Sequence, residues 1–152
     1  IMTSNIGSSD LIENMQDDGK ISAEVEERVT GQLKNYFRPE FLNRIDDIII
    51  FSPLTKSQIM EIITLSLKGL EKRLADRGMN LELTNEAKGF IAEQAYDPHY
   101  GARPVKRYLQ KNIETEIASM IIRGDVVDGQ TIMIDSDGEK LDIKAKLDIT
   151  AK

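Results

Sequence analysis

"SPLTKSQIMEII", residues 52 to 63, divides the chain into two parts of different character. Immediately before it stands "IIIF", residues 48 to 51, a largely β-branched run without alternation. Within it, Thr55 is followed three residues later by Gln58, a capping box that marks the start of a helix. The apolar residues that follow recur at helical spacing. We therefore expect a domain boundary directly after Ser52.

The residues before this boundary are typical of the tail of an α/β domain. A run such as "IIIF" suits a buried parallel strand, and "IMTSN", residues 1 to 5, passes from apolar to polar as the carboxyl end of a buried strand does. The first residue is not methionine, so we expect the chain to begin inside a larger domain. Residues 7 to 21 are rich in Gly, Ser, Asp and Asn, which predicts a mobile loop. Ser22 caps a predicted amphipathic helix, and Pro39 opens a short helical turn.

The residues after the boundary predict an α+β unit. An apolar stripe that begins at Ile59 indicates a first helix, which Gly78 ends. "NLELT" predicts a strand, Thr84 caps a second helix, and Pro104 starts a long third helix that stops at Gly124. "TIMID" and "LDIKA" alternate with period two, which favours a hairpin whose connection can exceed two residues.

The predicted fold class is therefore α/β, with the tail of a large α/β subdomain followed by an α+β small subdomain. The small subdomain is expected to contain about three helices and a three-stranded sheet. We expect the first part to cover residues 1–52, the second 53–147, and a tail without an assigned role 148–152.

Composition excludes several classes of function. The chain has 152 residues, no cysteine and one histidine, which leaves no disulfide framework and no zinc cluster. The net charge of -6 argues against a nucleic-acid partner, because binding many phosphates requires a basic surface. No apolar run approaches the roughly 20 residues that span a bilayer, and no secretory signal opens the chain, so we expect a cytoplasmic protein without a membrane partner.

The motifs of a complete nucleotide-hydrolysing site are missing. The sequence contains no G-x-x-x-x-G-K-[ST] loop for phosphates, and no apolar strand ends in the Asp-Glu pair that could hold Mg²⁺. This chain should therefore be inactive as an ATPase by itself.

Three polar residues at the ends of apolar elements remain as candidates. The amide of Asn5 could orient a water or a phosphate oxygen, or it could form an Asx turn. Arg44 could serve a ligand, or it could pair with Asp46 or Asp47. Both interpretations of each residue stay open on spacing alone.

Arg103 directly precedes Pro104, at the N-terminus of the long third helix, where a cation is disfavoured by the helix dipole. A negative partner close by would remove this penalty. The partner could be a bound phosphate or a carboxylate such as Glu116, and the residues alone do not decide between them.

Three motifs in a fixed order resemble the Clp family of AAA+ unfoldases. "MTSN" stands near the start, "FRPEFLNRID" covers residues 37 to 46, and "YGARP" covers residues 100 to 104. The resemblance extends from Ile1 to about Asp142 and is specific because all three motifs and their connecting helices agree. It implies the C-terminal end of the second ATPase module, with the AAA+ small subdomain closing it.

The resemblance also implies roles for single residues. Asn5 matches sensor 1, which positions the attacking water, and Arg44 matches the arginine finger, which reaches the ATP of a neighbouring subunit. Arg103 matches sensor 2, which binds the γ-phosphate of its own subunit's ATP. Ile59 matches a position that lines the adenine pocket, although a role in the core fits equally well. The implied cofactor is Mg-ATP, with the magnesium ligands outside this fragment.

Family members that serve the ClpP peptidase carry an Ile/Leu/Val-Gly-Phe/Leu tripeptide between the first two motifs. Here Ile6 and Gly7 are followed by Ser8, so the chain looks like a ClpB-type disaggregase of the stress response. Such a chaperone is expected to form a homohexamer, to act on misfolded or aggregated polypeptide, and to have a DnaK-type chaperone as a further partner. The alternatives are a ClpC/ClpA-like unfoldase and a stand-alone interaction module that uses the hairpin edge.

Overall fold

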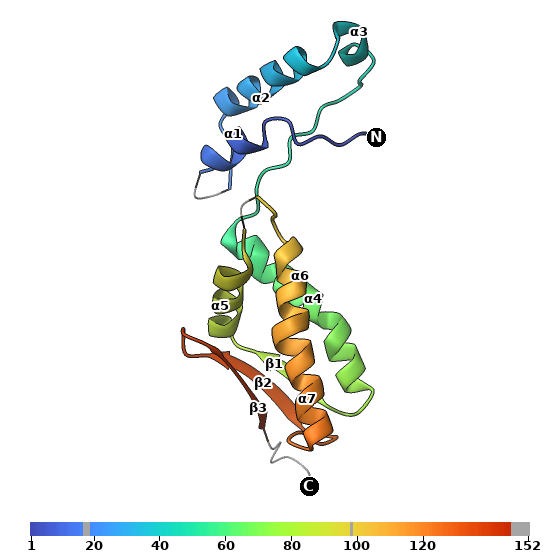
Figure 1. Cartoon of the computed structure of the whole chain (residues 1–152), viewed down its shortest axis with the longest axis vertical. Coiled ribbons are helices and arrows are strands. Elements are labelled where there is room, and N and C mark those ends of the chain that lie inside the picture. The colour runs from blue at the N-terminus through green and yellow to red at the C-terminus, as the bar shows by residue number, and fades with distance from the viewer. Residues whose placement is uncertain (17–18, 98, 147–152) are drawn as a thin grey trace. The chain divides into compact units, whose positions relative to one another are not determined.

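The computed structural model describes residues 1–16, 19–97 and 99–146 and divides the chain into two compact units (Figure 1). The first unit is Ile1–Thr55 and the second is Lys56–Lys152. The division falls at the start of the helix that the capping box predicts, a few residues after the expected boundary.

Helices make up the regular structure described in the first unit: α1 (Ser8–Glu13), α2 (Ala23–Tyr36) and α3 (Pro39–Leu42). The predicted start of α2 is confirmed, because the hydroxyl of Ser22 accepts a hydrogen bond from Val25 N–H at 3.4 Å. α3 begins at the predicted proline. Figure 1 shows α1 and α2 running beside each other.

The loop expected over residues 7 to 21 is wrong for its first half, where α1 lies. Leu11 of α1 is buried together with Val25 and Val29 of α2. Burial of this side chain outweighs the turn propensity of its polar neighbours, since propensity is a weak preference that tertiary contacts override. Residues 17 and 18 of the expected loop lie outside the described residues.

Neither strand expected in the first unit is present. Residues 1–5 and 48–51 have no regular structure, and the side chains of Ile49 and Phe51 are 71% and 83% exposed. A strand requires a hydrogen-bonded neighbour, and the described residues of this unit contain no strand with which either segment could pair. A β-branched composition without a strand partner therefore yields irregular chain, in which Ile50 packs against the buried cluster of α1 and α2.

The second unit contains a three-stranded sheet with the strand order β1-β2-β3. β1 (Asn80–Leu83) runs parallel to β2 (Thr131–Ser136), which pairs antiparallel with β3 (Leu141–Lys146). The predicted strand and hairpin are confirmed, and residues 137–140 form a connection longer than two residues. The predicted mixture of helices with a three-stranded sheet is therefore present.

Helices of the second unit supply most of its core. α4 (Lys56–Ala75) and α5 (Asn85–Ala95) precede a long helix made of α6 (Arg103–Leu109), η1 (Gln110–Glu114) and α7 (Thr115–Arg123). The apolar stripe predicted on α4 is confirmed by the burial of its members. All of these segments and β2 contribute large apolar residues that are at most 2% exposed, including Ile59, Ile63, Leu67, Ile91, Val105, Ile113, Ile117, Ile132 and Ile134.

A π-helical turn interrupts the long helix, and the sequence did not predict it. The hydroxyl of Thr115 donates to the carbonyl of Gln110 at 2.9 Å, and the amide of Asn112 donates to the carbonyl of Tyr108 at 3.0 Å. These side chains provide donors where the wider turn changes the backbone pattern. The helix then ends before Gly124, as predicted.

Thr84 connects the start of α5 to the sheet. Its hydroxyl accepts a hydrogen bond from Ala87 N–H at 3.1 Å, which confirms the predicted cap, and donates to the carboxylate of Asp135 at 2.7 Å. This hydrogen bond and a second one from Ser136 N–H lower the pKa of Asp135 below its ordinary value, because both favour the charged carboxylate.

Ile63→Ala is expected to destabilise the second unit much more than Leu65→Ala. Ile63 is fully buried, whereas Leu65 on the same helix is 58% exposed. Truncating a buried isoleucine costs about 2–5 kcal/mol because it leaves a cavity, whereas a surface substitution changes the free energy of unfolding by about 0.5 kcal/mol or less. Urea denaturation followed by circular dichroism measures both values. Equal losses would contradict the assignment of this stripe to the core.

Candidate functional site

Asn5 lies in an exposed, irregular segment of the first unit. Its backbone carbonyl accepts a hydrogen bond from Ser8 N–H at 3.2 Å, at the entrance to α1. Its side-chain amide makes no hydrogen bond to the residues that the structure describes, and Ile6 N–H bonds the hydroxyl of Ser4 instead, at 3.2 Å. The Asx-turn interpretation is therefore not supported, and the amide is open to a ligand.

Gly7 determines the direction of the chain after Asn5. It precedes α1 with a φ of 78°, in the left-handed region that favours glycine. A Cβ atom at this position would lie 2.8 Å from Cγ1 of Val29, so the backbone contacts α2 directly. The position of Asn5, two residues earlier, is thereby tied to α2.

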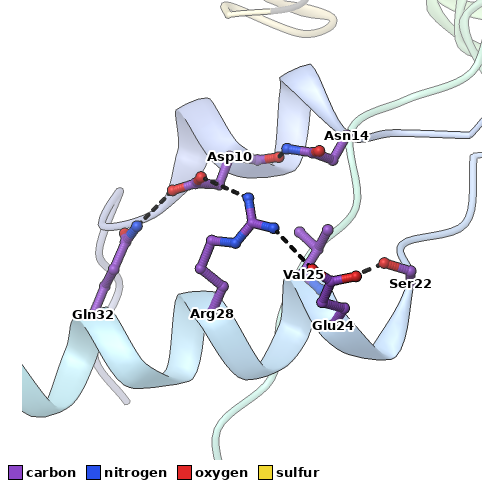
Figure 2. A network of polar contacts seen from close by, with 7 residues as sticks. All are labelled: Asp10, Asn14, Ser22, Glu24, Val25, Arg28 and Gln32. Carbon is purple, nitrogen blue, oxygen red and sulfur yellow. Dashed lines mark hydrogen bonds and ion pairs between the residues drawn. The ribbon is translucent and has the colours of Figure 1, made fainter.

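A polar network joins α1 to α2, and Figure 2 shows its members. The carboxylate of Asp10 accepts a hydrogen bond from Nε2 of Gln32 at 2.5 Å and lies 3.6 Å from Nη1 of Arg28. Arg28 also pairs with Glu24 at 3.4 Å, one turn earlier on the same helix. In Figure 2 the side chains of Gln32 and Arg28 both point from α2 toward Asp10.

Sequence reasoning missed this network. Asp10 and Gln32 are 22 positions apart, a separation that belongs to neither helical nor strand periodicity. The only local signal is an acidic residue in the first turn of a helix, which the helix dipole favours.

Arg44 follows α3 and is exposed. Its backbone N–H bonds the carbonyl of Phe41 at 3.1 Å, and the ring of Phe41 stacks on that of Phe37 with 5.1 Å between centroids. The predicted alternative, an ion pair with Asp46 or Asp47, is absent among the described residues, and Asp47 accepts from its neighbour Ile48 N–H at 2.8 Å. The guanidinium is presented on a short folded turn without a carboxylate of the described chain beside it.

Arg103 is the first residue of α6 and is exposed. The loop before it is ordered by Asp97, whose carboxylate accepts from His99 N–H at 2.8 Å and from Tyr100 N–H at 3.3 Å. The carbonyl of Asp97 accepts from Gly101 N–H at 2.7 Å. Asp97 therefore closes the turn from which Arg103 projects, a contribution that the motif alone did not indicate.

The carboxylate considered as a partner of Arg103 is engaged elsewhere. Glu116 pairs with Arg123 at 3.0 Å. Within the described ranges no carboxylate lies in ion-pair distance of Arg103, so the helix N-terminus carries an unbalanced cation. This arrangement favours an external anion as its partner.

Ile59 is fully buried on α4. Its burial supports the role in the core that sequence analysis left open. Contact of Ile59 with an adenine base stays a prediction.

A groove in the second unit is lined by none of the predicted site residues Asn5, Arg44, Ile59 and Arg103. It has a volume of about 540 Å³ and lies between the π turn and the hairpin. Lys111 and Lys140 line it together with Glu116 and Glu139, so its charge does not favour an anion.

No group of three or more Asp, Glu, His or Cys side chains in the described ranges is arranged to hold a metal ion. Across those same ranges, every helix is too short or too polar to span a bilayer.

Comparison with known proteins gives two family matches. Residues 54–134 match the C-terminal D2-small domain of ClpB protein, and residues 1–48 match the AAA domain of the Cdc48 subfamily. The chaperone protein ClpB of Bacillus cereus (strain ATCC 10987 / NRS 248) is 47% identical over 96% of this chain and 17% of that protein. That of Clostridium tetani is 50% identical over 93% of this chain and 16% of that protein. The chain thus spans about a sixth of the length of these curated relatives.

Part of the chain in solved structures of Hsp104 has the same fold. The extended Saccharomyces cerevisiae Hsp104:casein complex superposes with a TM-score of 0.73 and 34% identity, over 95% of this chain and 25% of that one. A closed state of Hsp104 with ATPγS and FITC casein gives a TM-score of 0.74 and 36% identity, over 94% and 24% of the two chains.

Gly101→Ala is expected to destabilise the second unit by about 1–2 kcal/mol, because a left-handed conformation costs that much for a residue with a side chain. Gly101 has a φ of 61° and no atom within 4 Å of a Cβ placed there, so the cost is conformational rather than steric. Gly89→Ala is the matched control, since that position also has open space but lies inside α5. It should stabilise by about 0.5–1 kcal/mol. Urea denaturation of both variants tests the difference, and equal effects would contradict the left-handed turn before Arg103.

Proposed function

The chain belongs to the ClpB family, and we propose that it forms the C-terminal part of an ATPase module in a ring-shaped protein-unfolding chaperone. The matches to ClpB chaperones and the Hsp104 complexes with casein support polypeptide as the substrate. In this proposal the complete protein is a cytoplasmic disaggregase that acts on misfolded or aggregated chains as a homohexamer. A DnaK-type chaperone is a further proposed partner, which the family relationship alone supports.

The observation that carries this proposal is the pairing of the arginines. In the second unit Arg73, Arg77 and Arg123 bind carboxylates at 2.9, 2.8 and 3.0 Å. Within the described ranges four arginines have no such partner: Arg38, Arg44, Arg103 and Arg107. Among these four, Arg44 and Arg103 each follow a turn closed by backbone hydrogen bonds and match the motif positions named above. A guanidinium group that no carboxylate neutralises, on a backbone fixed by hydrogen bonds, is suited to binding phosphate oxygens.

We propose three roles from the positions of these residues in the family motifs, which the unpaired guanidinium groups support. Arg103 binds the γ-phosphate of ATP held by its own subunit, and Arg44 contacts the ATP of the adjacent subunit. Asn5 orients the water that attacks the γ-phosphate. ATP with its magnesium supplies the phosphoanhydride bond whose hydrolysis drives unfolding, while the phosphate loop and magnesium ligands come from outside the present sequence.

The segment between the two units is the proposed link between ATP hydrolysis and movement of the second unit. Residues 51–55 have no regular structure and directly precede α4. We propose that this segment is a hinge, so that the second unit rotates when Arg103 gains or loses the γ-phosphate. Differential binding of Arg103 to ATP and ADP supplies the free energy for the rotation.

The segment between Asn5 and Arg44 supports a chaperone rather than a peptidase-serving unfoldase. After Ile6 and Gly7 the chain enters α1, whose apolar residue Leu11 is buried against α2. Among the described residues of this segment no apolar tripeptide projects as an anchor for a peptidase.

In the full-length ring protein, Arg44→Ala should lower kcat for ATP hydrolysis by about 10³-fold or more, since an arginine finger stabilises charge in the transition state. ATP affinity should change by less than about threefold. Steady-state ATPase assays and nucleotide titration measure the two quantities. Arg38→Ala is the matched control, because Arg38 is also exposed beside α3 and has no role in the proposed site. Weak ATP binding with normal turnover at saturation would refute the role of Arg44.

Arg103→Ala should weaken ATP binding by about 10- to 100-fold, the equivalent of one lost charge-assisted hydrogen bond. ADP binding should change little, because ADP lacks the γ-phosphate. Titration of each nucleotide by fluorescence or calorimetry separates the two effects. Arg107→Ala provides the control, because Arg107 is exposed on the same helix. Equal losses of ATP and ADP affinity would contradict the assignment of Arg103 to the γ-phosphate.

A further inference from the structure

The contact between α1 and α2 has a directional component centred on Asp10. One carboxylate oxygen of Asp10 accepts from Gln32 at 2.5 Å, and the other faces Arg28 at 3.6 Å. The Asp10 side chain is only 25% exposed, so both oxygens are occupied at a partly covered position. Figure 2 shows these contacts side by side along one face of α2.

The same face of α2 also receives the backbone at Gly7. The Cβ position of Gly7 falls 2.8 Å from Val29 and 3.3 Å from Oε1 of Gln32. The backbone carbonyl of Asn5 accepts a hydrogen bond from Ser8 N–H, which connects Asn5 to the residues on either side of Gly7. Gln32 therefore bonds Asp10 in the first turn of α1 and lies close to Gly7, two residues after Asn5.

The C-terminal end of α2, one turn beyond Gln32, leads to Arg44. Phe37 N–H bonds the carbonyl of Leu33, the Phe37 ring stacks on Phe41, and Arg44 N–H bonds the carbonyl of Phe41. Gln32 lies four residues before the end of α2 at Tyr36, about one helical turn away. Asn5 and Arg44 are thus both tied to the C-terminal half of α2, Asn5 through the contacts of Gly7 and Asp10 and Arg44 through Phe37 and Phe41.

Apolar contact alone does not define this arrangement. Leu11, Val25 and Val29 attract α1 to α2, but burial of apolar surface has no preferred direction. A hydrogen bond between a carboxylate and an amide does depend on distance and angle. The pair of Asp10 and Gln32 therefore fixes the register of α1 along α2.

We propose that Asp10 and Gln32 are positioning residues that hold Asn5 in place relative to Arg44, so that one nucleotide site is aligned with the next. This inference rests on the proposed function, because it assumes that Asn5 orients the attacking water. Neither residue contacts nucleotide in this scheme. Both act through Asn5.

The test uses the full-length ring protein and ATP. Asp10→Ala and Gln32→Ala should each lower kcat by about tenfold with KM for ATP changed less than about twofold, since small displacements of a positioned group lower the rate more than binding. The double variant should lose no more than either single variant. Glu24→Gln is the control, because Glu24 contacts Arg28 but not the pair, and its kcat should be unchanged.

Two further variants separate positioning from a merely structural role. In the Asn5→Ala background, Asp10→Ala should cause no additional loss of kcat, because its effect passes through Asn5. Exchanging the groups by combining Asp10→Asn with Gln32→Glu should restore kcat to within about threefold of the parent, since carboxylate and amide still face each other. The exchange also keeps the interface polar and paired if Asp10→Ala fails to fold.

The outcomes distinguish the two proposals. Normal kcat in Asn5→Ala would overturn the sensor role and with it the positioning role. A low kcat in Asn5→Ala with normal kcat in Asp10→Ala and Gln32→Ala would overturn the positioning role alone. Additive losses in the Asn5→Ala background, or no recovery in the exchanged variant, would also overturn it.

Discussion

Burial of one apolar surface, shared by the helices of the second unit and by β2, determines where Arg103 is presented. Ile132 and Ile134 are fully buried, and they lie on the same face of β2 because alternate strand residues point the same way. Val105 and Leu109 of α6 are buried as well, at helical spacing. Arg103 stands two residues before Val105, so the core anchors the helix from which the cation projects. The turn closed by Asp97 sets only the local direction.

The first unit relies on a different balance of interactions. Its small buried cluster contains Leu11, Val25 and Val29, which is little apolar surface for holding two helices in one register. Directional contacts at Asp10 and the close approach of Gly7 to α2 supply what such a small cluster lacks. The position of Asn5 is consequently determined by polar geometry and backbone contact, whereas that of Arg103 follows from a core.

Periodicity in the sequence predicted the elements whose determinants are local. The Ser22 cap, the stripe on α4 and the alternation of the hairpin each lie within a few residues. Residues 48–51 have the composition of a strand but no strand beside them, and Ser8–Glu13 has the composition of a turn but finds a buried position for Leu11. For these two segments prediction failed because the outcome depends on a partner distant in sequence. The π turn is different, because its hydrogen bond from Thr115 to Gln110 is local but helical spacing does not distinguish a π turn from an α-helix.

The same distinction between local and distant determinants applies to the residues of the candidate site. The resemblance of short motifs drew attention to Arg44 and Arg103, and in the structure both are exposed with no carboxylate partner among the described residues. An exposed ion pair stabilises a protein by only about 0–1 kcal/mol, so leaving such arginines unpaired costs the fold little. Asp10 and Asp97, which arrange the backbone around the candidates, could not be recognised from spacing, because their importance lies in which N–H groups and side chains reach them. The fold can therefore present unneutralised cations at small cost in stability, and the surrounding hydrogen bonds contribute chiefly to position.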